Sequence, residues 1–210
     1  MRAPDLDRLL AAFEGPDPPR DGRPPGLAAV LLALYEAPRG PSLLYIRRAE
    51  GMRSHPGEVS FPGGRVDPTD QGPLHAALRE AHEEVGLHPS RVERVAHVVD
   101  HLTYRGSTVC AYVGRVRDEP PTQPASPEEV ADVFLVPLDE LLDPEAYEAR
   151  RIDGMPRDRR VHYWHVKPYT IWGITGELTA RFLHRACGWT PPAEARTVAS
   201  VEEFVPRSRA

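Results

Sequence analysis

Three glutamates, Glu80, Glu83 and Glu84, have the residue type and the spacing to do chemistry together. Residues three and four apart are neighbours on a helix surface, so these carboxylates would crowd on one face and repel each other by roughly a few tenths of a kcal/mol per pair. A bound divalent cation removes that cost, and hard carboxylate oxygens favour Mg²⁺ or Mn²⁺. A solvated acidic helix face, which is common in proteins, is the alternative interpretation of the same pattern.

The segment that carries these glutamates has the pattern of an amphipathic helix from Leu74 to Val85. Its apolar residues fall within one arc of the helix, which is typical of a face buried against a core. Arg79 precedes Glu83 by four residues, so the two can form an ion pair that orients the carboxylate. Gly86 follows the last turn, where glycine commonly ends a helix.

The rest of the chain predicts an α/β fold around that helix. Apolar runs predict strands at 28–35, 43–47, 92–99, 109–116, 130–136 and 161–165, and helical spacing predicts helices at 4–14, 138–142 and 170–187. Regular βαβ alternation is missing, which argues against a doubly wound sheet. The loop at 49–71, interrupted only by a short apolar segment at 59–61, is long enough to suggest a functional role.

Three segments follow from this organisation. We expect an N-terminal helix and Pro-rich connector at 1–25, one domain at 26–188, and a C-terminal tail at 189–210. The tail is polar and contains proline from Pro191 onward, so we expect it to pack loosely.

Composition and charge narrow the class of protein further. The formal net charge is −5 and the isoelectric point about 6.0, so a strongly basic surface that recruits nucleic acid is not expected. The sequence has no stretch apolar enough to span a membrane, and the N-terminus lacks the basic and apolar regions of a secretion signal. We therefore expect a cytoplasmic protein without a nucleic-acid or membrane partner, and the sequence leaves open whether it is a monomer or a homodimer.

The segment 79–87, Arg-Glu-Ala-His-Glu-Glu-Val-Gly-Leu, resembles the second half of the Nudix box, the signature of Nudix hydrolases. It matches the pattern Arg-Glu-apolar-x-Glu-Glu-x-Gly-apolar at every fixed position. The first half departs in two ways: the spacing from Gly64 to Arg79 is one residue longer than usual, and Asp70 stands where the box usually has glutamate. An insertion before the helix leaves the helix carboxylates in place, so we interpret the segment as a variant box in which the role of Asp70 is open.

This resemblance implies a Nudix-type α/β/α sandwich with a mixed β-sheet and a metal-dependent pyrophosphatase activity. It implies that Glu80 and Glu84 bind Mg²⁺, with Mn²⁺ as a substitute, and that the backbone of Gly64 approaches the metal, since glycine has no Cβ. Glu83 would complete the metal shell or act as the general base. The candidate catalytic residues are therefore Glu83, Arg79 and Glu80, with Arg79 orienting the carboxylates.

A second resemblance lies upstream, in segment 48–64 with the pattern Arg-Ala-x-x-x-Arg-x-x-x-Gly-x-x-x-Phe-Pro-Gly-Gly. It is similar to the extra signature of the coenzyme A pyrophosphatase subgroup, although the usual Leu-Leu-Thr-x-Arg opening is only partly kept. Segment 169–175, Tyr-x-Ile-Trp-Gly-x-Thr, also resembles the terminal helix region of that subgroup. These likenesses imply hydrolysis of coenzyme A to 4′-phosphopantetheine and adenosine 3′,5′-bisphosphate, with Arg48, Arg53 and His55 contacting the substrate phosphates.

Two other functions remain open on the sequence alone. The first is a pyrophosphatase for another nucleoside diphosphate conjugate, such as ADP-ribose or NADH. The second is a non-catalytic Nudix-fold module that binds a nucleotide, although a pure binder has no need for the full set of glutamates. Further residues have open roles: Glu129 as an alternative general base, His101, Tyr104 and Arg105 as a substrate rim or a plain loop, and Tyr169 and Trp172 as adenine-stacking rings or core aromatics at helical spacing.

Overall fold

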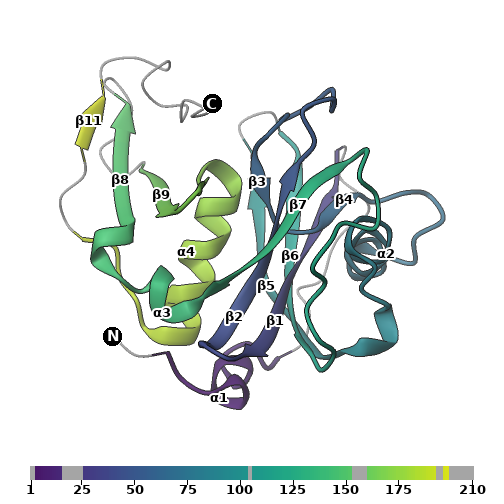
Figure 1. Ribbon diagram of the computed structural model, residues 1–210, viewed down its shortest axis with the longest axis horizontal. Coiled ribbons are helices and arrows are strands. Elements are labelled where there is room, and N and C mark those ends of the chain that lie inside the picture. The colour runs from purple at the N-terminus through teal and green to yellow at the C-terminus, as the bar shows by residue number, and fades with distance from the viewer. Residues whose placement is uncertain (1–2, 16–25, 104–105, 153–159, 193–195, 199–210) are drawn as a thin grey trace.

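Two β-sheets form the framework of the molecule in the computed structural model, which describes residues 3–15, 26–103, 106–152, 160–192 and 196–198 (Figure 1). The larger sheet has the strand order β3-β2-β1-β6-β5, with β4 paired to β1 and β7 paired to β2. Its strands are β1 (Ala28–Ala37), β2 (Gly40–Arg48), β3 (Val59–Ser60), β4 (Gly63–Arg65), β5 (Val92–Leu102), β6 (Thr108–Val116) and β7 (Val130–Pro137). Because β1 pairs in parallel with β6 and antiparallel with β2, the sheet is mixed.

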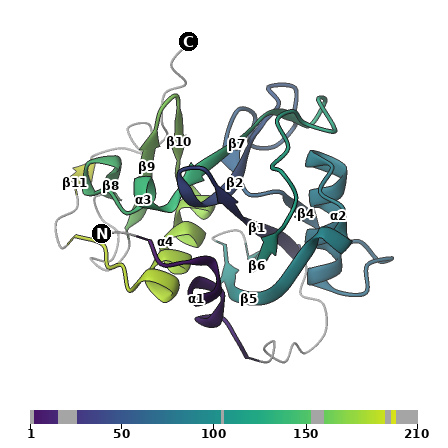
Figure 2. The same ribbon diagram turned by 60° about the horizontal axis from the view of Figure 1, so that its bottom comes forward.

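Helices cover both faces of this large sheet. Helix α2 (Pro73–Val85) packs on one face, and α1 (Leu6–Ala11) and α4 (Gly173–Cys187) pack together on the other (Figure 2). Alternation along β1 separates the two cores: Leu31 lies in the core under α2, whereas Leu32 lies in the core under α1 and α4. The predicted α/β/α sandwich is confirmed.

Helix α2 begins and ends close to the predicted residues. Pro73 occupies its first turn, where the missing N–H is not needed, and Gly86 ends it in the left-handed conformation (φ 73°). The buried side chains Ala76, Ala77 and Ala81 are small, so the helix lies close to the sheet. Helix α2 packs against both β1 and β4. Its glutamates therefore lie next to β4, the short strand near the end of the long loop.

The smaller sheet corrects the expectations for the C-terminal part. Its order is β10-β9-β8-β11, with β8 (Tyr147–Ile152), β9 (Val161–Val166), β10 (Tyr169–Ile171) and β11 (Arg196–Val198). The helix predicted at 170–187 begins only at Gly173, because residues 169–171 pair with β9 as a strand. The sequence pattern does not predict β8, which is rich in charged residues. It also does not predict β11, which lies in the tail expected to pack loosely and pairs with β8.

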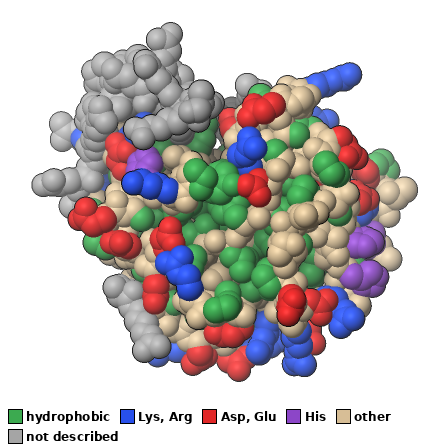
Figure 3. Space-filling view, in the orientation of Figure 1, with side chains coloured by type: hydrophobic (Ala, Val, Ile, Leu, Met, Phe, Trp, Pro, Cys, Tyr) green, Lys and Arg blue, Asp and Glu red, His purple; other side chains and the backbone are tan. Residues whose placement is uncertain are grey.

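Short helical segments connect these layers: helix α3 (Leu138–Leu141) follows β7, and 3₁₀ turns lie at Pro89–Arg91 and Pro144–Ala146. On the face seen in Figure 3, acidic and basic side chains are interspersed with apolar ones rather than gathered by sign. Among the described helices, none combines the length and the apolar character that a membrane crossing requires.

Candidate active site

Glu80 and Glu84 lie against the two glycines of strand β4. The backbone N–H of Gly63 donates a hydrogen bond of 2.9 Å to Oε2 of Glu84. A Cβ on Gly63 would overlap the backbone of β1, so that position requires glycine. A Cβ on Gly64 would overlap the carboxylate of Glu80 and would displace it from the strand. The two glycines therefore let the strand backbone and the helix carboxylates meet at close range.

The carboxylates of Glu80 and Glu84 are held where a negative charge is disfavoured. Glu84 is only 2% exposed, and burial raises its pKa from 4.5 to about 8, with the charges of Glu80 and Glu129 acting in the same direction. Burial also raises the pKa of Glu80. A nearby cation favours the charged form of such groups, and donors that are all oxygen suit Mg²⁺ or Mn²⁺. The donor chemistry of the site therefore fits the divalent metal predicted from the sequence.

The carboxylates of α2 would supply only part of a metal shell rather than a closed cage. Within the described residues, no three His, Cys, Asp or Glu side chains converge closely enough to hold an ion by themselves. Glu83 is exposed and directs Oε2 to Arg79, at 2.9 Å. Mg²⁺ usually takes few carboxylates and completes its shell with water and phosphate, so a partial set made of Glu80, Glu84 and the Gly64 backbone fits that ion.

Arg79 ties helix α2 to the loop in front of it. Its guanidinium donates two hydrogen bonds of 3.1 Å to Asp70, one of 3.0 Å to Glu80, one of 2.9 Å to Glu83 and one of 3.1 Å to the carbonyl of Arg65. A guanidinium has five N–H donors, so all of them are used. The predicted ion pair between Arg79 and Glu83 is confirmed.

Asp70 is the residue whose role the sequence leaves open. It is 2% exposed, and hydrogen bonds from Arg79, together with His75 and the backbone of Asp67, hold the pKa of its carboxyl well below the usual range. Asp70 therefore anchors Arg79, and the extra residue between them does not separate the pair. The position of Asp70 in the variant box is the sequence signal for its role as the anchor of Arg79. Nothing in the sequence predicts that His75 also binds Asp70.

The three residues predicted to contact phosphates divide into two groups. Arg48, at the end of β2, places Nη1 4.0 Å from Oε1 of Glu84, and its Nε is buried without a hydrogen-bond partner in the described part of the chain. Arg53 and His55 lie exposed in the loop between β2 and β3, where His55 pairs with Glu58 at 2.9 Å. Across the described residues, no ion pair joins Arg53 or His55 to the glutamates of α2.

Other candidate residues lie around the cluster or away from it. Glu129 is close enough that its charge raises the pKa of both Glu80 and Glu84, so it stays a candidate general base. His101 lies near α4, and burial lowers its pKa. Tyr104 and Arg105 lie outside the described residues.

The interpretation of Tyr169 and Trp172 as aromatics at helical spacing is wrong. Tyr169 lies in strand β10, and Trp172 is the residue that precedes helix α4. The ring of Tyr169 stacks on Phe134 with centroids 4.0 Å apart, and that of Trp172 stacks on Tyr163 at 6.1 Å. Both rings pack against the protein's own aromatics, in line with the alternative of core packing.

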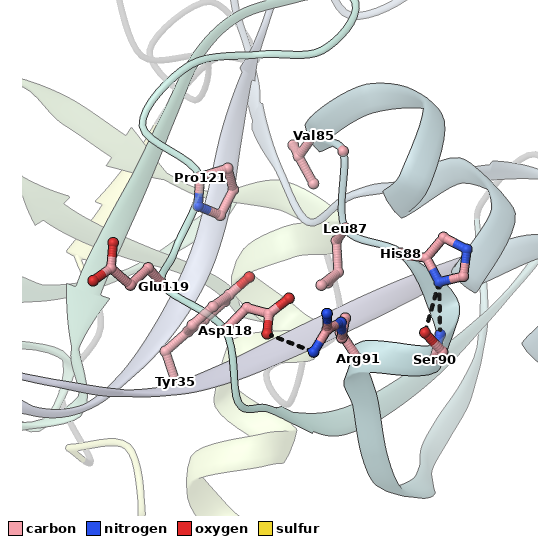
Figure 4. Close-up of a pocket in the computed structure, with 10 residues that line it drawn as sticks. Tyr35, Val85, Leu87, His88, Ser90, Arg91, Asp118, Glu119 and Pro121 are labelled. Atoms are coloured by element: carbon pink, nitrogen blue, oxygen red, sulfur yellow. Dashed lines mark hydrogen bonds and ion pairs between the residues drawn. The ribbon is translucent and has the colours of Figure 1, made fainter.

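A cavity of about 630 Å³ lies beyond the C-terminal end of α2, where Gly86 and Leu87 leave the helix (Figure 4). Tyr35 forms part of its wall, and Asp118 pairs with Arg91 across 3.4 Å. Residues that follow α2 line this cavity, rather than the buried glutamates. Because Asp118 and Arg91 pair with each other and the candidate metal donors lie elsewhere, we place the chemistry at the carboxylates.

Comparison with known proteins connects this geometry to a family. The family model described as NUDIX domain matches residues 24–158. A Nudix hydrolase named NudL from Enterobacter sp. (strain 638), itself uncharacterized, is 42% identical over 179 residues, which are 82% of this chain and 90% of that protein. The mouse peroxisomal coenzyme A diphosphatase NUDT7 is 39% identical over 142 residues, which are 65% of this chain and 60% of the mouse protein.

The fold has counterparts among solved structures. A MutT/nudix family protein from Enterococcus faecalis superposes with a TM-score of 0.52, covering 87% of this chain and 69% of that one. The two sequences are 15% identical, so this likeness concerns the fold alone.

Proposed function

The chain belongs to the Nudix hydrolase family, and we propose that it hydrolyses coenzyme A at its diphosphate, with Mg²⁺ or Mn²⁺ held by the glutamates of α2. The products would be 4′-phosphopantetheine and adenosine 3′,5′-bisphosphate. One observation carries the choice of substrate: Arg48, the first arginine of the segment that resembles the coenzyme A signature, lies 4.0 Å from Glu84 of the Nudix box. The similarity to the mouse coenzyme A diphosphatase supports the same choice.

The residues of the site divide the work of hydrolysis. Glu80, Glu84 and the Gly64 backbone would hold the divalent cation, which when bound would neutralise diphosphate charge and lower the pKa of bound water. Arg79 fixes the orientation of Glu80 through its hydrogen bond of 3.0 Å. Arg48 offers a guanidinium, whose planar fork suits phosphate oxygens.

The proton of the attacking water has two candidate acceptors. Glu83 is exposed and hydrogen-bonded to Arg79, so its carboxylate is oriented and accessible. Glu129 lies in the loop before β7, close enough for its charge to raise the pKa of Glu84. Either carboxylate would act as the general base while Arg48 and the cation hold the diphosphate.

Substrate competition tests the proposal directly. The purified protein would be incubated with coenzyme A, ADP-ribose and NADH, each with Mg²⁺, and the products identified by mass spectrometry. We expect the highest kcat/KM with coenzyme A and the two products named above. Faster turnover of ADP-ribose or NADH would contradict the choice of substrate, and no turnover with either Mg²⁺ or Mn²⁺ would favour a binding module.

A further inference from the structure

Two hydroxyl groups from the C-terminal part of the chain bind the large sheet beside the active site. Thr175, in the first turn of α4, donates a hydrogen bond of 3.0 Å from Oγ1 to the carbonyl of Val59 on β3. Tyr169, on β10, donates its hydroxyl to Oδ2 of Asp132 on β7. Both hydroxyls come from beyond residues 24–158, the part that the family model matches.

Both acceptors lie at the same level of the sheet. Arg47 on β2 pairs in register with Val59 on one side and with Asp132 on the other. The two hydroxyls therefore hold the strands on both flanks of Arg47. The register between β2 and β7 shifts at the next residue, Arg48, whose guanidinium approaches Glu84.

Strand β3 especially needs such support. It has two residues and pairs with β2 only at Ile46 and Arg47, so its own pairing with β2 is short. Gly63, whose N–H binds Glu84, follows Val59 by four residues. A hydrogen bond that fixes the Val59 carbonyl therefore limits where Gly63 and the adjoining carboxylate can lie.

We propose that Tyr169 and Thr175 are positioning residues for the diphosphate-hydrolysing site, which rests on the function proposed above. Neither hydroxyl touches the glutamates. Each fixes a strand next to β2, and together they set the place of Arg48 and of the Gly63 N–H. The ring of Tyr169 stacks on Phe134 at 4.0 Å, so the hydroxyl can be removed while the packing stays.

Shape-conserving substitutions test this role. In Thr175→Val and Tyr169→Phe we expect kcat to fall about tenfold to a hundredfold, the size typical of residues that orient metal ligands, with a smaller change in KM. Thr175→Ser keeps the hydroxyl and should restore kcat to within about twofold of the wild type. Wild-type kcat in Thr175→Val and Tyr169→Phe would overturn the proposal.

Tyr45→Phe is the matched control. The Tyr45 hydroxyl lies 3.1 Å from Oγ1 of Thr179, so it also joins the large sheet to α4 by one buried hydrogen bond, two residues before Arg47. We expect kcat of Tyr45→Phe to stay within about twofold of the wild type, whatever its effect on the melting temperature. An equal loss of kcat in Tyr45→Phe and Thr175→Val would mean that any lost contact between the large sheet and α4 lowers kcat, and it would overturn the proposal.

Hydrogen exchange separates this proposal from the proposed function. We expect the Gly63 amide of the metal-free protein to exchange faster in Thr175→Val than in the wild type, and to be unchanged in Tyr45→Phe. If the wild type cleaved no diphosphate, the proposed function would fail, yet faster exchange at Gly63 would still support the positioning role. Unchanged exchange at Gly63 in Thr175→Val would overturn it.

Discussion

Glu84 is almost completely buried and lies near the negative charges of Glu80 and Glu129. Both features raise its pKa, so the stability of the protein depends on pH. Its pKa is about 8 in the folded protein, against 4.5 for an unperturbed glutamate, so folding favours the protonated acid. The stability that this provides is fully present below pH 4.5 and is lost as the pH rises through 8. A shift of this size corresponds to on the order of a few kcal/mol between those limits.

Glu84→Gln makes that contribution measurable. Without metal, the free energy of unfolding of the variant should rise relative to the wild type as the pH goes from 5 to 8, because glutamine has no proton to lose. The difference in unfolding free energy between the two proteins is the quantity to follow. Burial lowers the pKa of His101 and His162, so these histidines make stability rise with pH, opposite to Glu84. Their effect is the same in the wild type and the variant and therefore cancels in the difference. Chemical denaturation at several pH values measures it.

The same variant should lose activity. If Glu84 is a metal ligand, kcat of Glu84→Gln should fall on the order of a thousandfold, because losing several kcal/mol of charge stabilisation has that effect. A stability difference that does not change with pH would contradict the buried-acid argument. An unchanged kcat would contradict the assignment of Glu84 as a ligand.

Local spacing explains which contacts of the site were predictable. Arg79 and Glu83 are four residues apart on one helix, and helix geometry alone brings them together at 2.9 Å. The bond from Arg79 to Asp70 spans nine residues and depends on how the loop before α2 folds back. The burial of Glu84 depends on β4, which is paired to β1 from a distant part of the sequence, so no periodicity could indicate it.

At the scale of elements, α1 and α4 build the second helical layer although both lie outside the matched family segment. Phe13, just after α1, is 1% exposed and stacks on Phe182 of α4 with ring centroids 5.4 Å apart. The helical pattern predicts α1, because its Leu residues recur at helical spacing. It misplaces the start of α4, since a three-residue strand such as Tyr169–Ile171 is formed by pairing with β9 and is too short to show a period.

Phe13→Ala tests how much this layer contributes to stability. Emptying a buried phenylalanine site typically costs about 3–5 kcal/mol, so a clear drop in melting temperature is expected. Leu102→Ala is the control, because Leu102 is 68% exposed and its removal should change stability by about 0.5 kcal/mol or less. Equal effects of the two substitutions would mean that the α1–α4 contact is not part of the cooperative fold.

At the scale of the whole molecule, the mixture of strands and helices was enough to predict the class of fold but not the strand order. β2 pairs with β7 and β1 pairs with β6, and the partners in each pair come from widely separated parts of the sequence. Pairings of this kind depend on side-chain packing between strands, which a single sequence does not display.

Binding of the cation should be coupled to unfolding of the whole chain. A ligand that binds only the folded state at a hundred times its Kd stabilises it by about 2.7 kcal/mol, or roughly 5–10 °C in melting temperature for a chain of this size. We expect Mg²⁺ to raise the melting temperature of the wild type, with NaCl at equal ionic strength as the control. The rise should be largely lost in Glu84→Gln, and an equal rise in both proteins would place the metal elsewhere.

The Mg²⁺ shift in melting temperature of Glu83→Gln tests whether Glu83 completes the metal shell or acts as the general base, two roles that the geometry does not distinguish. The Glu83 carboxylate is exposed and bound to Arg79, so the amide can keep one of its contacts without a charge. If Glu83 is the base, the variant should keep the full Mg²⁺ shift in melting temperature and lose kcat. If Glu83 completes the metal shell, the shift and kcat should fall together. Full activity with a full shift would exclude both roles and leave Glu129 as the base.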